Sequence, residues 1–202
     1  MEIVLIGTGN TATILGRMLK KAGHTIVQIY GRNANAASEL AYELNTESTN
    51  YWSVVTRTAD LYLIAVSDIA IEEVVKEIHL PESTIVHTAA SISKHVLKNT
   101  STHYGVLYPL QSLRKEISYL PPMPIIIDAS DDVTFHQLEN LATTLSNTVV
   151  AAGDEQRVKL HLAAVFCNNF VNHIYKLTEK YCLDEGLDFS LLLPLIKETA
   201  DR

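Results

Sequence analysis

The sequence predicts an α/β protein, with a mainly parallel sheet flanked by helices and an all-helical C-terminal region. Three observations carry this prediction. First, short β-branched or aliphatic runs alternate with helical patterns up to about residue 150. Second, an apolar strand near the start of the chain leads directly into a glycine turn and a helix. Third, the pattern becomes purely helical after about residue 153. We therefore expect two domains, 1–152 and 153–202.

Each predicted strand is an apolar or β-branched run bounded by turn residues. Strands are expected at 2–6, 25–30, 61–66, 84–88, 104–108, 124–128 and 147–151. Helices are expected at about 10–22, 33–45, 68–78 and 131–146. Ser130, Asp131 and Asp132 are good capping residues for the last of these helices, and the proline-rich stretch 119–124 predicts a turn.

The C-terminal region predicts one long helix from Asp154 to Leu183, a stop at Gly186 and a second helix from Phe189 onward. The sequence ends within this second helix, without a C-cap or a helix breaker. We therefore expect the helical domain to be truncated.

Composition excludes several classes of protein. The net charge of −7 and the pI near 5.6 argue against nucleic acid or an anionic membrane as a partner, because both require a basic face. The chain begins without the features of a secretion signal, and no stretch approaches the roughly 18 to 20 apolar residues of a membrane-spanning helix. We expect a cytoplasmic protein.

The two cysteines support the same location. Cys167 and Cys182 are 15 residues apart in one predicted helix, which would hold them about 22 Å apart and unpaired. Free thiols are typical of a reducing compartment. No Cys/His spacing resembles a zinc site, so no metal is expected.

The first functional motif is a G-x-G-x-x-A turn between an apolar strand and a helix. Its members are Gly7, Thr8, Gly9, Asn10, Thr11 and Ala12. Gly7 permits the tight turn, Gly9 lets a pyrophosphate approach the backbone, and Ala12 lets the helix pack close to the strand. The motif alone is also compatible with a purely structural turn, but its strand–turn–helix context predicts a dinucleotide site in a Rossmann-type domain.

The end of the second predicted strand favours NADP(H) over NAD(H). This region reads Gly31, Arg32 and Asn33, with no acid to hold the ribose hydroxyls, whereas the Arg32 guanidinium suits a 2′-phosphate. The alternative is that Arg32 is a solvated loop residue and Asn33 caps the next helix.

Other predicted strand ends are expected to line the same crevice. Val66, Ser67 and Thr88 are assigned to the cofactor on this ground. Asp68 is expected to be the N-cap of the following helix, and His87 a core histidine whose hydrogen bonds are satisfied.

A polar stripe marks the long helix. His161, Asn168 and Asn172 follow helical spacing on one face, and Asn169 and His173 form an adjacent pair. These side chains either face a nicotinamide or substrate carbonyl, or satisfy one another at a helix–helix interface.

Taken together, the chain resembles the Rossmann-type NADP oxidoreductases that carry a C-terminal helical dimerisation domain of uncharacterised function. These are distant relatives of pyrroline-5-carboxylate reductase, the deazaflavin-dependent NADP reductases and the β-hydroxyacid dehydrogenases. The resemblance covers essentially the whole chain and rests on Gly7–Ala12, Tyr30–Asn33, Ala65–Asp68, His87–Ala89, Tyr108–Gln111 and His161–Phe170. It implies bound NADP(H), a cleft between the two domains and a homodimer formed by the helical part.

One departure from the relatives concerns the catalytic group. β-Hydroxyacid dehydrogenases place a lysine one turn before the asparagine of the long helix, where this chain has Ala164 and Val165, and Lys159 is out of phase. Alcohol oxidation by a lysine acid/base is therefore disfavoured. Reduction of an imine fits better, because the cofactor supplies hydride and the protein needs one proton donor and good positioning.

The sequence leads to two hypotheses. In the first, the protein reduces a small imine- or carbonyl-containing metabolite, with His161, Asn168 and Asn169 orienting or protonating the substrate and Tyr108, Pro109 and Gln111 shaping its pocket. In the second, it is a non-catalytic NADP-binding dimer with a sensing or scaffold role, and the polar stripe is an interface.

Overall fold

A computed structural model describes residues 1–117, 119 and 122–201. It divides into two compact units, Met1–Lys159 and Leu160–Arg202. The division falls inside helix α5 (Asp154–Ala164), seven residues after the expected boundary at 152/153. A turn is expected over 119–124, and residues 120 and 121 of this turn lie outside the described residues.

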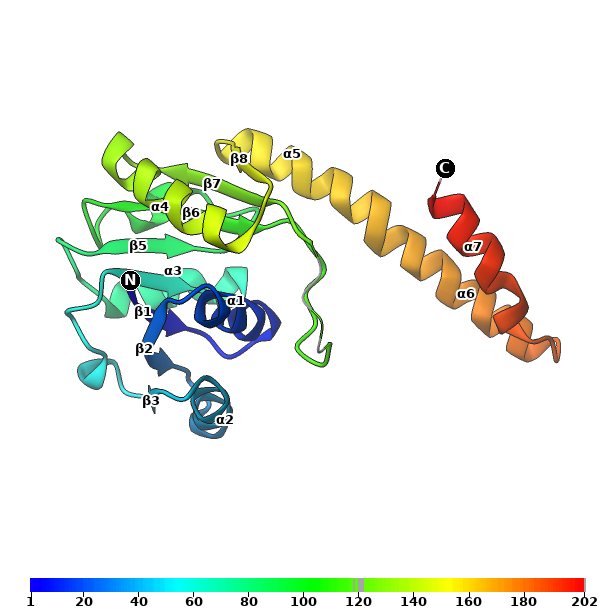
Figure 1. Ribbon diagram of the computed structural model, residues 1–202, viewed down its shortest axis with the longest axis horizontal. Helices are drawn as coiled ribbons and strands as arrows, with labels where there is room; N and C mark the ends of the chain where they lie inside the picture. Colours follow the sequence, from blue (N-terminus) through cyan, green and yellow to red (C-terminus); the bar gives the residue numbers. More distant parts are fainter. Residues whose placement is uncertain (118, 120–121, 202) are drawn as a thin grey trace. The chain divides into compact units, whose positions relative to one another are not determined.

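The first unit is built on one eight-stranded sheet (Figure 1). Its strands are β1 (Glu2–Ile6), β2 (Thr25–Tyr30), β3 (Glu47–Thr49), β4 (Leu61–Ile64), β5 (Thr84–His87), β6 (Tyr104–Pro109), β7 (Ile125–Ala129) and β8 (Val149–Ala151). They lie in the order β3-β2-β1-β4-β5-β6-β7-β8, and only β6 and β7 pair antiparallel. The chain therefore reverses its direction of winding between β1 and β4, where such sheets bind ligands.

The predicted fold class is confirmed. All seven expected strands are present, and β1 and β2 have the expected bounds. One further strand, β3, was not expected and extends the sheet by pairing with β2. This strand has only three polar residues, Glu47 to Thr49, so it carries no apolar alternation by which it could be recognised.

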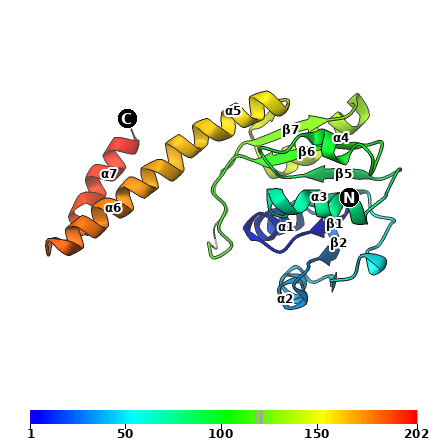
Figure 2. The same cartoon turned by 180° about the vertical axis from the view of Figure 1, so that it is seen from behind.

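Helices cover both faces of the sheet. Helices α1 (Asn10–Lys21), α2 (Ala34–Leu44) and α4 (Asp132–Leu145) pack on one face, and α3 (Asp68–Glu77) packs on the other (Figures 1 and 2). Alternate strand residues enter the two cores: Ile3 and Leu5 face the first, and Val4 and Ile6 the second. Both faces are buried, which explains why the central strands read as continuous apolar runs.

Capping residues explain where the helices begin. The Asp131 side chain accepts a hydrogen bond from Thr134 N at 2.9 Å, as expected for the start of α4. Asn33 caps α2 in the same way, through Ala36 N at 3.1 Å. The expectation for Asp68 was wrong, because Ser67 occupies the N-cap and Asp68 is the first residue of α3. There its carboxylate still lies at the positive end of the helix dipole.

Arg157 anchors the start of α5 in the first unit. Its side chain is fully buried and donates to Ala90 O at 3.0 Å, Ile92 O at 2.6 Å and Asp154 Oδ1 at 2.8 Å. Asp154 also accepts hydrogen bonds from Ser93 Oγ and Lys94 N. These contacts hold the first turns of α5 against the loop after β5, which is why the unit extends to Lys159.

Asp128 on β7 completes this buried polar cluster. Its carboxylate receives Lys94 Nζ at 2.7 Å and lies 3.9 Å from Arg157 Nη1. Within the described residues, Nη1 has no hydrogen-bond acceptor. Two cations, Arg157 and Lys94, are thus matched by two carboxylates, Asp128 and Asp154, which is the condition for keeping such charges buried.

The second unit consists of helices. After α5 the chain forms a π-helical segment (Val165–Phe170), then α6 (Val171–Asp184), a 3₁₀ turn (Phe189–Leu192) and α7 (Leu193–Ala200), which returns alongside α6 (Figures 1 and 2). Gly186, with φ of 69°, follows the end of α6 as expected. Cys167 and Cys182 are unpaired, as predicted. In the described part of the chain, no helix is both long and apolar enough to cross a membrane.

The π-helical segment changes the predicted face of the polar stripe. A straight α-helix was expected over 154–183, and on it His161, Asn168 and Asn172 share one side. The wider i→i+5 turns shift the residues that follow by about one position, or roughly 100°, relative to straight α-helical spacing. Once the π-helical turns are taken into account, Asn172 therefore no longer shares a face with His161.

Replacement of Arg157 tests the anchor. We expect Arg157→Met to lower the free energy of unfolding in urea by about 3 kcal/mol, because it leaves the Asp154 carboxylate without its buried cation. Lys159→Met removes a cation from the same helix, but one with a 72% exposed side chain, and should cost less than about 1 kcal/mol. Equal losses in the two variants would contradict the anchoring role of Arg157.

Candidate nucleotide-binding site

The turn between β1 and α1 has room for glycine alone at its first position. Gly7 has φ of +128°, and its N–H donates to Tyr30 O at 2.8 Å. A Cβ atom there would lie 2.3 Å from Ala65 O on the neighbouring strand connection. Any side chain would therefore both strain the backbone and separate β1 from the end of β4.

The second glycine leaves space for a ligand. Gly9 is the N-cap of α1, and a Cβ placed on it would meet no atom within 4 Å. The first N–H groups of a helix have no intrahelical acceptors, and α1 has no acid in its first turn to neutralise their positive charge. An open space next to these N–H groups fits a pyrophosphate.

A cavity of about 810 Å³ opens over this turn. It is bounded by the loops after β1, β2 and β4 and by one side of α3. Ten of the twelve predicted cofactor residues line it: Gly7, Thr8, Gly9, Asn10, Thr11, Gly31, Arg32, Asn33, Val66 and Ser67. The structure thus brings together residues from three separate strand ends.

The other two predicted cofactor residues lie outside the cavity lining. Ala12 is fully buried in the core under α1, where its small side chain lets the helix approach the sheet. Thr88 is buried beside β4, and both its backbone N–H and its hydroxyl donate to Ile64 O. These two residues support the site without bordering it.

Arg32 stands at the rim of the cavity with a side chain that is 77% exposed. Its Nη1 lies 3.4 Å from Glu73 Oε2 on α3. The Asn33 side-chain oxygen, by contrast, caps α2 by accepting a hydrogen bond from Ala36 N. Of the neighbouring pair, Arg32 is therefore the residue that brings a mostly exposed cation to the rim of the cavity.

Several lining residues escaped the sequence analysis. Tyr30 and Trp52 stack with ring centroids 3.5 Å apart and form an aromatic wall, and burial raises the pKa of Tyr30. Glu73, Lys76 and Glu77 line the cavity from α3. Their i, i+3, i+4 spacing predicts a shared helix face, but no local signal says that this face meets the nucleotide turn.

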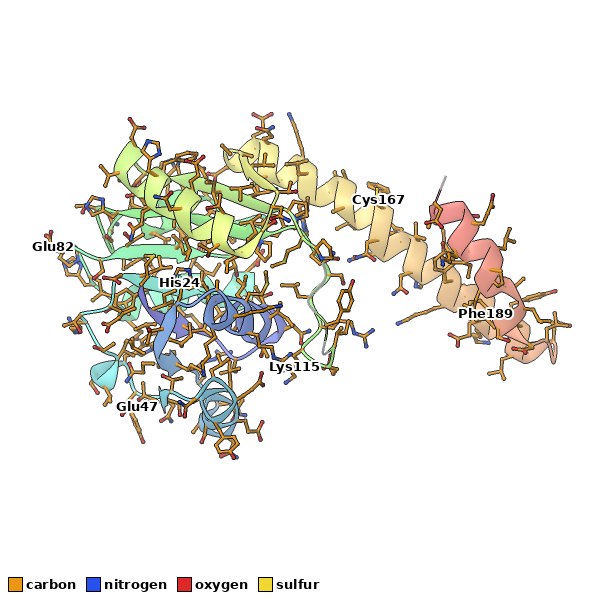
Figure 3. All side chains as sticks on the ribbon, viewed as in Figure 1. His24, Glu47, Glu82, Lys115, Cys167 and Phe189 are labelled. Atoms are coloured by element: carbon orange, nitrogen blue, oxygen red, sulfur yellow. The ribbon has the colours of Figure 1, made fainter. Side chains whose placement is uncertain are left out.

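The loop between β6 and β7 is hydrogen-bonded to the start of α1 through Lys115. Asn10 Oδ1 accepts from Lys115 N at 3.2 Å, and Arg17 Nη1 donates to Lys115 O at 2.8 Å. Arg17 is itself held by Glu43 on α2. Figure 3 labels Lys115 on this loop, which joins β6 to β7. The contact links residues 105 positions apart, so no local sequence pattern predicts it.

His87 is a core residue, as expected, but only one of its nitrogens is satisfied. Nδ1 accepts from Ala89 N at 3.2 Å, which places the proton of the neutral ring on Nε2. Nε2 is buried and has no partner among the described residues. Burial, reinforced by the charge of Arg157, lowers the pKa of His87 to about 4, so the ring is neutral near pH 7.

Of the predicted substrate residues, Tyr108 and Pro109 are buried at the end of β6 and Gln111 is exposed in the loop that follows. The Gln111 side chain is engaged by Pro122 O and Ser112 N. Burial raises the pKa of Tyr108. None of the three lines the nucleotide cavity.

The predicted catalytic residues all belong to the second unit. His161 is half-buried near the end of α5, whereas Asn168 and Asn169 are exposed on the π-helical segment (Figure 3 labels the adjacent Cys167). Isolated π-helical turns occur frequently at functional sites. The structure therefore brings Asn168 and Asn169 together on an unusual turn, within a unit separate from the one that holds the cavity.

Two family models match parts of this chain. Residues 2–91 match the family described as NADP oxidoreductase coenzyme F420-dependent, and residues 123–202 match a domain of unknown function, DUF2520. The structure is similar to that of a candidate NADP oxidoreductase from Bacteroides fragilis, with 40% sequence identity and a TM-score of 0.91, covering 99% of this chain and 79% of that one. No curated protein matches the sequence.

Two further structures are similar in fold alone. A pyrroline-5-carboxylate reductase from Streptococcus pyogenes has 16% identity and a TM-score of 0.77, covering 99% of this chain and 76% of that one. A reductive aminase from Aspergillus terreus, in complex with NADPH, has 15% identity and a TM-score of 0.77, covering 99% and 72%. The resemblance drawn from the sequence is confirmed: the chain belongs to the family of the Bacteroides fragilis protein, NADP oxidoreductases in which a Rossmann-type domain precedes a DUF2520 domain.

Proposed function

We propose that the protein binds NADP(H) in the cavity over the β1–α1 turn and uses it to reduce a small imine- or carbonyl-containing metabolite. The observation that carries the proposal is that one cavity contains both an open helix N-terminus at Gly9 and a mostly exposed guanidinium at Arg32. The first suits a pyrophosphate and the second a 2′-phosphate. Family membership supports the same cofactor.

The residues present would hold the two ends of the cofactor in different ways. The N–H groups at the start of α1 would receive the pyrophosphate, because no side chain fills the space above Gly9. Arg32 would hold the 2′-phosphate, and the stacked rings of Tyr30 and Trp52 would border the adenosine. When bound, the cofactor supplies hydride.

The second unit would then provide the proton and the positioning. The His161 imidazole is proposed as the donor, and the Asn168 and Asn169 amides would orient a substrate carbonyl or imine by hydrogen bonds. Tyr108, Pro109 and Gln111 are proposed to shape the substrate side. A substrate of the imine class suits these residues, since no lysine occupies 164 or 165 to act as the acid/base.

A second candidate function is a non-catalytic NADP-binding dimer. It is favoured by a stripe of exposed apolar side chains on the second unit. The stripe comprises Leu162, Phe166, Phe170, Ile174, Leu177 and Tyr181, each between 50% and 60% exposed. So long an apolar surface is normally covered. A second copy of the chain would bring an identical stripe to it, as the expected homodimer requires.

The cofactor assignment is tested at Arg32. Arg32→Ala should weaken NADPH binding about tenfold or more, the worth of a charge-assisted hydrogen bond to phosphate, and change the Kd for NADH less than about twofold. Isothermal titration with both nucleotides measures this. Arg57→Ala, an exposed arginine outside the cavity lining, is the matched control. Equal weakening of both nucleotides in Arg32→Ala would argue against contact with the 2′-phosphate.

The catalytic assignment is tested at Asn169. In a screen of small imines and carbonyl compounds with NADPH, Asn169→Ala should lower kcat/KM about a hundredfold, because a positioning contact made in the transition state is lost. NADPH affinity and molecular mass should not change. Asn147→Ala, in an exposed loop of the first unit, serves as control. Unchanged turnover in Asn169→Ala would exclude this role, and a wild-type protein inert to the whole panel would favour the non-catalytic function.

The dimer is tested at Phe170, which packs against Phe166 with ring centroids 5.0 Å apart. A charge introduced there by Phe170→Asp would be desolvated in an apolar interface, so we expect the variant to sediment as a monomer. Asn172→Asp adds the same charge to the neighbouring helical surface and should leave the mass unchanged. A wild-type protein that is monomeric at micromolar concentration would refute the homodimer.

A further inference from the structure

The rim of the cavity around Arg32 carries charges of both signs. Arg32 and Lys76 are positive, whereas Glu73 and Glu77 are negative, and all four line the cavity. A 2′-phosphate brought to Arg32 would carry about two negative charges into this mixed rim. The rim therefore does not favour a phosphate as strongly as Arg32 alone would.

Glu73 is the rim carboxylate that contacts Arg32. The end of β2 has no acid, but α3 supplies one from a distant part of the sequence, with Glu73 Oε2 at 3.4 Å from Arg32 Nη1. The guanidinium that would hold a 2′-phosphate is thus already in contact with a carboxylate from α3, and both residues line the cavity.

The contact between the two side chains is weak enough to be exchanged. Both are mostly exposed, 77% for Arg32 and 68% for Glu73, and the separation of 3.4 Å is long for a charge-assisted hydrogen bond. Exposed pairs of this kind contribute at most about 1 kcal/mol, equivalent to roughly a fivefold change in affinity. A bidentate phosphate on Arg32 can therefore displace Glu73, but the exchange costs the contact between Arg32 and Glu73.

We propose that Glu73 is a specificity-determining residue that narrows the preference for NADPH over NADH. In the absence of a 2′-phosphate it engages Arg32. When NADPH binds, the 2′-phosphate must take Arg32 from Glu73, and when NADH binds the Arg32–Glu73 pair stays intact. This inference rests on the proposed binding of NADP(H) in this cavity. It adds a second determinant of cofactor preference, Glu73 on α3, to the first, Arg32 after β2.

The test measures the Kd of NADPH and NADH for the full chain and for Glu73→Gln. The neutral amide keeps the size of the side chain and removes the charge, so the ratio of the NADH Kd to the NADPH Kd should rise about fivefold. Glu72→Gln removes the same charge from the adjacent residue, which is exposed and outside the cavity lining, and should leave the ratio within about twofold.

A double-mutant cycle separates an effect through Arg32 from a general loss of negative charge. In an Arg32→Ala background, Glu73→Gln should change the ratio less than about twofold, because the partner through which Glu73 acts is missing. A ratio that stays constant in the single variant, or that rises equally in both backgrounds, overturns the inference while leaving NADP(H) binding intact. A wild-type protein that binds neither nucleotide overturns the proposed function and this inference together.

Discussion

The nucleotide cavity depends on the close approach of Gly7 to Ala65. At this point the end of β1 is tied to both neighbours, through Gly7 N to Tyr30 O at 2.8 Å and Ala65 N to Ile6 O at 2.7 Å. The three strand ends can meet only because residue 7 lacks a side chain. Their meeting brings the start of α1, the Arg32 loop and the start of α3 around one space. A single backbone conformation thus supports every contact proposed for the cofactor.

The first unit builds the nucleotide cavity from its own residues. All lining residues fall between Gly7 and Glu77. The second unit has another character, with exposed amides on a π-helical segment and an apolar stripe beside them. This division explains why cofactor binding can be assigned with more detail than the substrate. The cavity in the first unit defines the shape and charge that a cofactor must match. The second unit contributes exposed amide and apolar side chains for contact with a substrate or a partner.

The sequence predicted those parts of the site that are local in the chain. The strand, turn and helix around Gly7 and the Arg32–Asn33 pair lie within short segments, so order and residue type were enough to find them. Glu73 and Trp52 reach the same cavity only through the packing of α3 and of the segment after β3, for which no local pattern exists. The π-helical segment also has no residue signature, and it invalidated the straight-helix spacing from which the face of Asn172 was derived.

The position of Arg157 limits where a different helical region could be joined to the nucleotide-binding unit. The last strand ends at Ala151, yet Arg157, which holds the loop after β5 through Ala90 O and Ile92 O, comes from the first turns of α5. A helical region joined directly after the last strand would lack Arg157 and leave the carbonyls of Ala90 and Ile92 without these donors. A join that keeps these hydrogen bonds lies beyond Arg157, so the nucleotide-binding unit carries the beginning of its neighbour's helix with it.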